Sequence, residues 1–205
     1  MIISHKHKFI FLKTKKTAGT SIEISLSRYC GDKDIITPIS PADEEIRAKL
    51  GIQPQNYQGK FYNHIRAKHV KNLIGEEIWN SYYKFCFDRN PWDKVISLYH
   101  YRSNPVTVTF DDFLKSSEFQ LSYNFPIYTI NDQLAVDYIG KYENLENDLK
   151  MICNKIGLPF DGWLPRAKGN FRKNHQHYRT VYNKQQKELI QHYYKKEIDL
   201  LGYEY

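Results

Sequence analysis

The stretch Lys13-Thr14-Lys15-Lys16-Thr17-Ala18-Gly19-Thr20-Ser21 decides the fold of this chain. The apolar residues 9–12 precede it and predict a buried strand, and Ile22, Ile24 and Leu26 follow it in a helical pattern. A helix N-terminus presents unpaired backbone N–H groups and the positive end of the helix dipole. A strand, a short loop of lysines and small hydroxyl residues, and then a helix therefore form the geometry of a phosphate site.

The loop differs from the phosphate loop of ATP- and GTP-using enzymes, which reads G-x-x-x-x-G-K-[ST]. The first glycine of that motif is missing, and Lys16 precedes Gly19 instead of following it. We therefore expect a phosphate cradle for a ligand other than magnesium-ATP. The alternative, from the loop alone, is a basic surface turn, since such turns are common in α/β folds.

A second junction of strand and helix follows further along the chain. Residues 83–87 read as a buried strand, Asn90 suits a helix N-cap, and Pro91 suits the first helical position. Ligands of open α/β sheets bind beyond the carboxyl ends of strands. Arg89 stands at such an end, and Ser97 comes two turns into the next helix.

Arg89 and Ser97 could hold a second phosphate, because a guanidinium and a hydroxyl both donate to phosphate oxygens. The alternative for Arg89 is a structural ion pair with Asp88 or Asp93.

Residues 16–21 and 89–97 together resemble the sulfotransferases that use 3′-phosphoadenosine 5′-phosphosulfate (PAPS). The likeness is strongest to the carbohydrate branch that includes heparan sulfate 2-O-sulfotransferase. Residues 136–145 and 197–203 resemble later segments of the same family, in the expected order. One departure is Lys15, where the family usually has proline.

The resemblance implies an α/β fold like that of the P-loop kinases, as a single domain over residues 1–205. A central, mostly parallel sheet would be flanked by helices. It also implies that PAPS is the sulfuryl donor, that adenosine 3′,5′-bisphosphate (PAP) is the product, and that no metal takes part. The acceptor would be a hydroxyl group, most simply that of a saccharide.

The family's motifs assign the donor-binding residues. The first motif binds the 5′-phosphosulfate, which implies contacts from Lys16, Thr17, Ala18, Gly19, Thr20 and Ser21. The second motif binds the 3′-phosphate, which implies contacts from Arg89 and Ser97. A later loop of the family reaches the 3′-phosphate and adenine, and Arg172 and Lys173 are the candidates there. A plain solvated loop is the alternative for those two residues.

The resemblance also implies a general base, because the family places a histidine between its two phosphate motifs. His64 holds that position, and His69 is its nearest rival. An unperturbed imidazole titrates near neutrality, where a base is most useful. The implied mechanism is in-line transfer: His64 takes the acceptor's proton while Lys16 donates to the bridging oxygen of the leaving 5′-phosphate.

The acceptor side carries weaker signals. Arg66, close to His64, could meet an anionic acceptor. Residues 118–135 are irregular and aromatic, which fits core packing and, as the alternative, a flap that stacks on sugars.

Composition sets the outer bounds. The chain has 205 residues, 41% of them hydrophobic, which suits one domain. The net charge of +7 attracts polyanions without choosing among PAPS, an acidic glycan and nucleic acid. Three scattered cysteines form neither a metal pattern nor a disulfide framework. Cys86, in a predicted strand, is expected to be buried.

No stretch approaches the ~20 apolar residues of a membrane span, and the short polar start lacks a signal peptide. We therefore expect a cytoplasmic enzyme of bacterial or viral origin, or a truncated form of a membrane-anchored one. We expect no nucleic acid among its partners.

Two other interpretations stay open. A nucleotide kinase with a degenerate loop is opposed by the position of Lys16. A non-enzymatic basic module for polyanions would show salt-sensitive binding that Arg89→Ala barely affects.

Overall fold

The computed structural model describes residues 1–103, 107–165, 167 and 176–205. Contacts within the chain divide into two compact units. Unit 1 is Met1–Asp88 with Pro126–Ala167, and unit 2 is Arg89–Phe125 with Lys168–Tyr205. The single domain over residues 1–205 stays a prediction.

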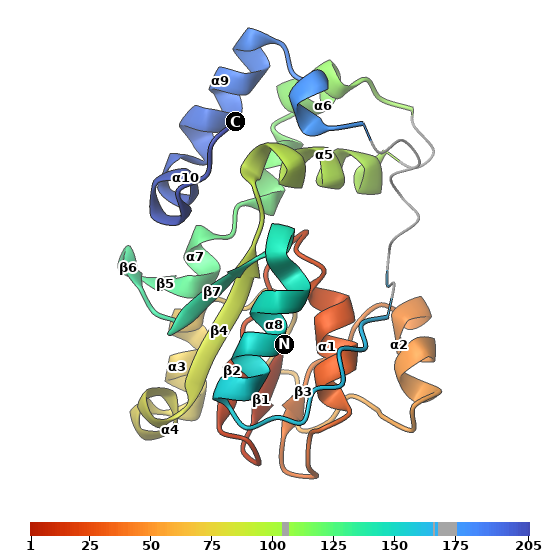
Figure 1. Ribbon diagram of the computed structural model, residues 1–205, viewed down its shortest axis with the longest axis vertical. Coiled ribbons are helices and arrows are strands. Elements are labelled where there is room, and N and C mark those ends of the chain that lie inside the picture. The colour runs from red at the N-terminus through yellow and green to blue at the C-terminus, as the bar shows by residue number, and fades with distance from the viewer. Residues whose placement is uncertain (104–106, 166, 168–175) are drawn as a thin grey trace. The chain divides into compact units, whose positions relative to one another are not determined.

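Unit 1 is built on a five-stranded sheet in the order β3-β1-β2-β4-β7 (Figure 1). The strands are β1 (Ile2–Ser4), β2 (Phe9–Phe11), β3 (Ile35–Ile36), β4 (Tyr83–Asp88) and β7 (Tyr138–Lys141). Strands β2, β4 and β7 run parallel, whereas β1 pairs antiparallel with both β2 and β3. The predicted α/β class, with a mostly parallel sheet between helices, is confirmed.

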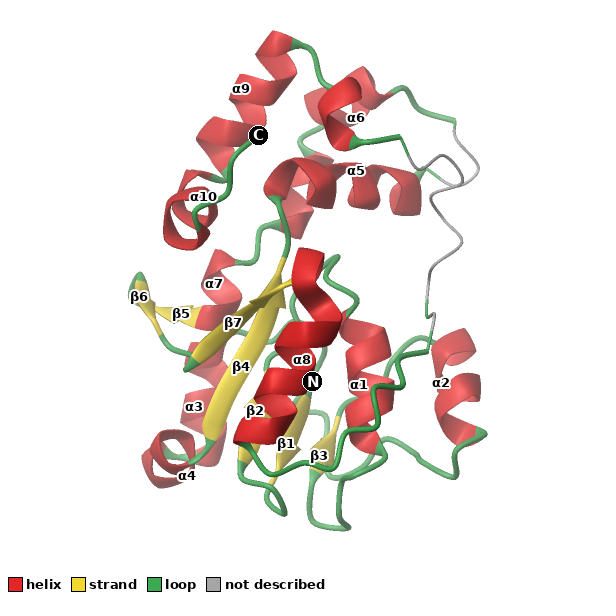
Figure 2. Ribbon diagram, viewed as in Figure 1, coloured by secondary structure: helices red, strands yellow, loops and turns green. Residues whose placement is uncertain are grey.

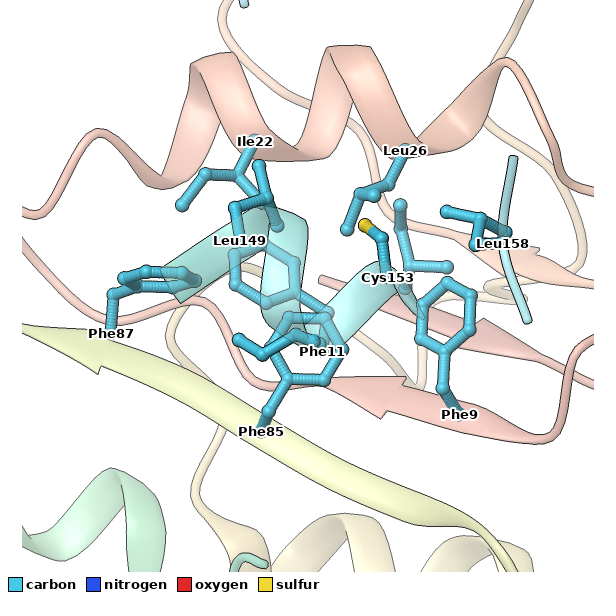
Figure 3. Close-up of a cluster of buried hydrophobic side chains, with 11 residues drawn as sticks. Phe9, Phe11, Ile22, Leu26, Phe85, Phe87, Leu149, Cys153 and Leu158 are labelled. Atoms are coloured by element: carbon cyan, nitrogen blue, oxygen red, sulfur yellow. The ribbon is translucent and has the colours of Figure 1, made fainter. Parts of the chain in front are cut away.

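One face of the sheet is covered by α1 (Gly19–Ser27) and α8 (Leu145–Lys155). Alternate residues of a strand point to the same face, so Phe9, Phe11, Phe85 and Phe87 all meet these helices (Figure 3). Their partners in the cluster include Ile22, Leu26, Leu149 and Cys153. This cluster holds β2 and β4 against α1, and thereby fixes the loop that joins β2 to α1.

The opposite face of β4 carries polar contacts. The ammonium of Lys84 donates to the carbonyl oxygen of Trp79 at 3.1 Å, in α4 (Glu76–Ser81). The hydroxyl of Tyr128, in α7 (Phe125–Tyr128), donates to the buried Asp88 carboxylate at 3.0 Å. Cys86, on the same face of β4, is fully buried, which confirms its prediction.

Smaller elements complete unit 1. They are α2 (Pro41–Ala48), α3 (Ala67–Ile74), the hairpin of β5 (Thr129–Ile130) and β6 (Gln133–Leu134), and η2 (Tyr142–Asn144).

The elements described in unit 2 are all helical (Figure 2). They are α5 (Pro91–Arg102), α6 (Phe110–Lys115), η1 (Glu118–Ser122), η3 (Tyr178–Thr180), α9 (Lys184–Tyr193) and α10 (Lys195–Leu201). Trp92, Val95 and Leu98 of α5 pack in one cluster with Ile190 and Tyr194. The buried Lys94 ammonium lies 2.5 Å from Glu197 Oε2, which ties α5 to α10.

The starts of three elements have distinct local structures. Asn183 caps α9 through a capping box with Gln186, and a separate helix, α10, follows α9. The polar start predicted before residue 9 is wrong, because Ile2–Ser4 form the buried β1. Ser40 occupies the N-cap of α2, yet its hydroxyl donates to the Asp43 carboxylate instead of capping the backbone.

Within the stretch 118–135, the aromatic side chains follow the core interpretation. Phe125 and Tyr128 are buried, and Tyr123 packs at the edge of the unit 2 cluster.

Candidate functional site

The loop between β2 and α1 has an unusual backbone. Lys16 has φ 63° and Ala18 has φ 58°, in the left-handed region that residues with a Cβ seldom adopt. Such conformations gather at ligand sites, where the surrounding structure enforces them. Ala18 is the N-cap of α1 and makes no side-chain capping bond. The first N–H groups of α1 thus have no acceptor within the helix, and an anion suits them.

Gly19 is required by close packing against Lys13. A Cβ on Gly19 would lie 2.8 Å from Cγ of Lys13 and 3.3 Å from the carbonyl oxygen of Thr14. The Lys13 side chain therefore runs directly beneath the first turn of α1. Thr20 and Ser21, which follow Gly19, are buried at the same end of the helix.

A chain of hydroxyl groups ties the loop to β4. The Thr14 hydroxyl donates to the carbonyl oxygen of Phe87 and lies 2.8 Å from the Thr17 hydroxyl. Because a hydroxyl has one proton to give, the Thr17 hydroxyl must be the donor in that second bond. Its proton is thus engaged inside the loop, which leaves the Thr17 backbone N–H as that residue's donor toward a ligand.

His64 lies against the same loop. Its Nδ1 atom is 3.0 Å from the carbonyl oxygen of Lys13. A carbonyl oxygen only accepts, so Nδ1 carries the proton and Nε2 of the neutral ring has a free lone pair. His64 has φ 63°, and its neighbour Asn63 donates to the carbonyl oxygen of Pro38 at 2.6 Å.

The pKa of His64 is lowered to about 4, chiefly because burial disfavours the charged ring. The charges of Lys13, Lys15 and the Met1 amino group lower this pKa further, whereas the hydrogen bond to the Lys13 carbonyl oxygen raises it. The expectation of a His64 pKa near neutrality is therefore wrong. The ring is neutral at pH 7 and can accept a proton at Nε2.

A buried carboxylate, Glu23 of α1, stands behind the loop. Its Oε2 lies 2.7 Å from the Lys13 ammonium, and its Oε1 lies 3.4 Å from Arg47 and 2.9 Å from the Met1 amino group. The Thr37 hydroxyl donates to Oε1 at 2.9 Å. Burial alone would raise the pKa of Glu23, but the surrounding positive charges lower it to about 2. Glu23 is therefore ionised throughout the working pH range.

The second predicted motif lies in unit 2. Asn90 caps α5, since its side chain accepts the N–H of Trp92, and Pro91 is the first helical residue, as predicted. The guanidinium of Arg89 is bonded to Asp93 Oδ2, at 2.9 Å from Nε and 2.5 Å from Nη2. The structural ion pair weighed as the alternative for Arg89 is thus present. Ser97 follows Asp93 by four residues, so both lie on one face of α5.

The remaining candidates differ in their placement. Lys16 and Ser97 are half-buried, whereas Arg66 and the rival histidine His69 are exposed. Arg172 and Lys173 lie outside the described residues.

Two residues of this site were not predicted, Lys13 and Glu23. The sequence did contain one signal for them. Glu23 is a single carboxylate within the helical run 20–27, and the other residues of that run are apolar or small and uncharged. A charge buried in such a run needs a partner of opposite charge. Lys13, which precedes the helix, is a cation that is itself buried.

The loop has the donors that a phosphosulfate requires: N–H groups of α1, the buried Thr20 and Ser21, and Lys16. Among the residues that the structure describes, no group of three His, Cys, Asp or Glu side chains could hold a metal ion. Within those same residues, no helix has the length and apolar character needed to cross a bilayer.

Comparison with known proteins adds the family. A model of the Sulfotransferase family matches residues 1–204. An uncharacterized protein of Archaeoglobus fulgidus is 42% identical over 96 residues, which cover 44% of this chain and 80% of that protein. No solved structure matches the chain.

Proposed function

Because this chain belongs to the sulfotransferase family and is a PAPS-dependent sulfotransferase, the open question is its acceptor. We propose that the acceptor is a saccharide hydroxyl. The observation that carries the mechanism is the contact of His64 with the loop: Nδ1 bonds to the Lys13 carbonyl, and Nε2 keeps its lone pair. A proton acceptor thus lies beside the loop that suits the donor's 5′-phosphosulfate.

In the proposed reaction, PAPS supplies the sulfuryl group, and the chain supplies orientation and proton transfer. His64 Nε2 takes the proton of the acceptor hydroxyl as its oxygen attacks sulfur. Lys16 donates to the bridging oxygen, where negative charge builds up as the bond to the 5′-phosphate breaks. The N–H groups of residues 17–21 and the hydroxyls of Thr20 and Ser21 hold the 5′-phosphate.

The protonation state of His64 fits its assignment as the general base. With a pKa of about 4, His64 is neutral at pH 7 and ready to accept a proton. An anionic donor close to the ring raises that pKa, because a negative charge favours the protonated imidazole. The base therefore becomes stronger once the donor is bound.

We propose that Arg89 and Ser97 bind the 3′-phosphate. The bond from Arg89 to Asp93 orients the guanidinium along the face of α5 that also carries Ser97. A guanidinium fork and a serine hydroxyl both donate to phosphate oxygens, which is the chemistry that a 3′-phosphate requires. The roles predicted for Arg172 and Lys173, at the 3′-phosphate and adenine, are retained as part of this proposal.

The saccharide acceptor rests on the resemblance to the carbohydrate branch and on exposed groups close to His64. Tyr62 is 50% exposed, and its ring can stack on a sugar. Arg66 is exposed two residues beyond His64 and suits an anionic substituent.

The test of the saccharide proposal is transfer of radiolabel from ³⁵S-PAPS to a panel of neutral and acidic oligosaccharides, with simple alcohols and amines in parallel. We expect label in a saccharide fraction that is released as O-sulfate, and none with His64→Ala. Label found only in amines or simple alcohols would overturn the saccharide assignment and leave the donor assignment standing.

A further inference from the structure

We propose that Lys13, whose ammonium is paired with Glu23, is a positioning residue of the active site. Its side chain supports the loop that binds the donor, and its carbonyl oxygen orients the ring of the base, His64. The inference rests on the proposed role of His64. Lys13 itself touches neither substrate in this proposal.

The side chain of Lys13 is fixed at two points. It is only 5% exposed, and its ammonium lies 2.7 Å from Glu23 Oε2. Its Cγ lies so close to Gly19 that a Cβ there would approach it to 2.8 Å. The side chain therefore forms the floor on which the first turn of α1 rests, where the donor's phosphate is expected.

The backbone of the same residue holds the base. Its carbonyl oxygen accepts Nδ1–H of His64, which selects the tautomer with a free Nε2. The next residue, Thr14, is anchored in turn by its hydroxyl bond to the Phe87 carbonyl. The carbonyl of Lys13 thus lies between two fixed points, and a shift of its side chain is transmitted to the ring of His64.

Stability alone gives a weak reason for this arrangement. Removing a lysine and a glutamate from water costs free energy that their mutual attraction often only offsets, and apolar replacements are frequently neutral. Glu23 also has Arg47, Thr37 and the Met1 amino group as partners without Lys13. A purely structural Lys13 could therefore be replaced by an uncharged side chain of similar length.

The key variant is accordingly Lys13→Met, which keeps the length of the stem and removes the charge. Glu23 keeps the Arg47 guanidinium and the Thr37 hydroxyl as partners in it, so we expect a folded protein, checked by circular dichroism. Lys13→Arg is the conservative partner, which keeps a charge for Glu23. Ile24→Val is the matched control, since Ile24 is uncharged, fully buried and next to Glu23 in α1.

Two measurements are made on each protein: the affinity for PAP by calorimetry, and the tautomer and titration of His64 by ¹⁵N NMR. The charges that act on the His64 ring come from Lys13, Lys15 and the Met1 amino group. In Lys13→Met we expect PAP to bind about tenfold more weakly or worse, a mixture of His64 tautomers, and a His64 pKa that moves upward. Lys13→Arg should largely restore the tautomer, and Ile24→Val should match the wild type in both measurements.

A folded Lys13→Met with wild-type PAP affinity and a wild-type His64 tautomer would overturn the inference. Equal effects in Ile24→Val would do the same, because they would trace the change to general loosening of α1. If the wild type itself fails to bind PAP, the proposed donor site is wrong, and the NMR comparison alone still decides whether Lys13 positions His64.

Discussion

The Nδ1 atom of His64 lies 3.0 Å from the carbonyl oxygen of Lys13, the residue that opens the loop between β2 and α1. The two residues are 51 positions apart in the chain. This single bond places a proton acceptor beside a helix N-terminus suited to an anion, and it determines which ring nitrogen is free. The predictions that follow test the parts of that arrangement separately.

Replacing the proposed base should abolish transfer and spare donor binding. We expect His64→Ala to lower kcat for sulfuryl transfer by about 10²- to 10⁴-fold, the usual contribution of a general base, with PAP affinity changed little. Rates from ³⁵S-PAPS and PAP calorimetry measure the two effects. His69→Ala is the control, because that histidine is exposed on α3. Comparable losses in both variants would remove His64 from its role.

The stability of the protein should depend on pH through His64. Its pKa is about 4 in the folded chain and 6.5 in the unfolded chain. Between these values the unfolded chain binds a proton that the folded chain does not, so the free energy of unfolding falls as the pH drops from 6.5 to 4. Above pH 6.5 this contribution is constant, and its full size is about 3 kcal/mol, from the shift between 6.5 and about 4.

Urea unfolding of the wild type and of His64→Gln over this pH range isolates the effect. The wild type should lose stability relative to the variant as the solution is acidified. A difference that does not change between pH 7 and pH 4 would show that the ring is not held in its neutral form.

The two adjacent loop lysines should differ in function. Lys16→Ala should lower kcat by about 10²- to 10³-fold, or 3–4 kcal/mol of barrier, because it removes a donor to the leaving oxygen. Lys15→Ala is the control one residue away, at the position where the family usually has proline. Single-turnover rates with saturating PAPS separate the chemical step from binding, and equal rates for Lys16→Ala and the wild type would exclude Lys16 from that step.

Removing the Arg89 guanidinium should erase recognition of the 3′-phosphate alone. We expect Arg89→Ala to bind PAP about ten- to a hundredfold more weakly, the loss of a charge-assisted contact, while its affinity for adenosine 5′-phosphate stays near that of the wild type. Arg102→Ala, at the C-terminal end of α5 and paired with Glu118, is the control. Parallel losses for both nucleotides would mean that Arg89 only supports α5 through Asp93.

The sequence was sufficient for the elements that have strong local signals. Short apolar runs predicted β2 and β4, and Asn90-Pro91 predicted the start of α5, because apolar runs and helix caps are local signals of a few residues. The short strand β1 escaped prediction, since three residues give almost no periodicity and the pairing partner decides.

The site was less predictable, because its key contacts join distant parts of the chain. A histidine near neutrality was expected at position 64, but its burial and the neighbouring cations lower its pKa to about 4. Thr17 was expected to contact the ligand, but its hydroxyl is bonded to that of Thr14. The pairing of Lys13 with Glu23 depends on the path of the loop beneath Gly19, which spacing alone does not give.

The central claim is that the loop at 13–21 belongs to a site for adenosine 3′,5′-bisphosphate. Its most direct test is a thermal-unfolding comparison of PAP, magnesium-ATP and adenosine 5′-phosphate at equal concentrations. A ligand at 100 times its dissociation constant adds about 2.7 kcal/mol of stability, so we expect a clear upward shift of Tm with PAP and a much smaller one with the other two. Stabilisation by magnesium-ATP without stabilisation by PAP would contradict the account and favour a kinase.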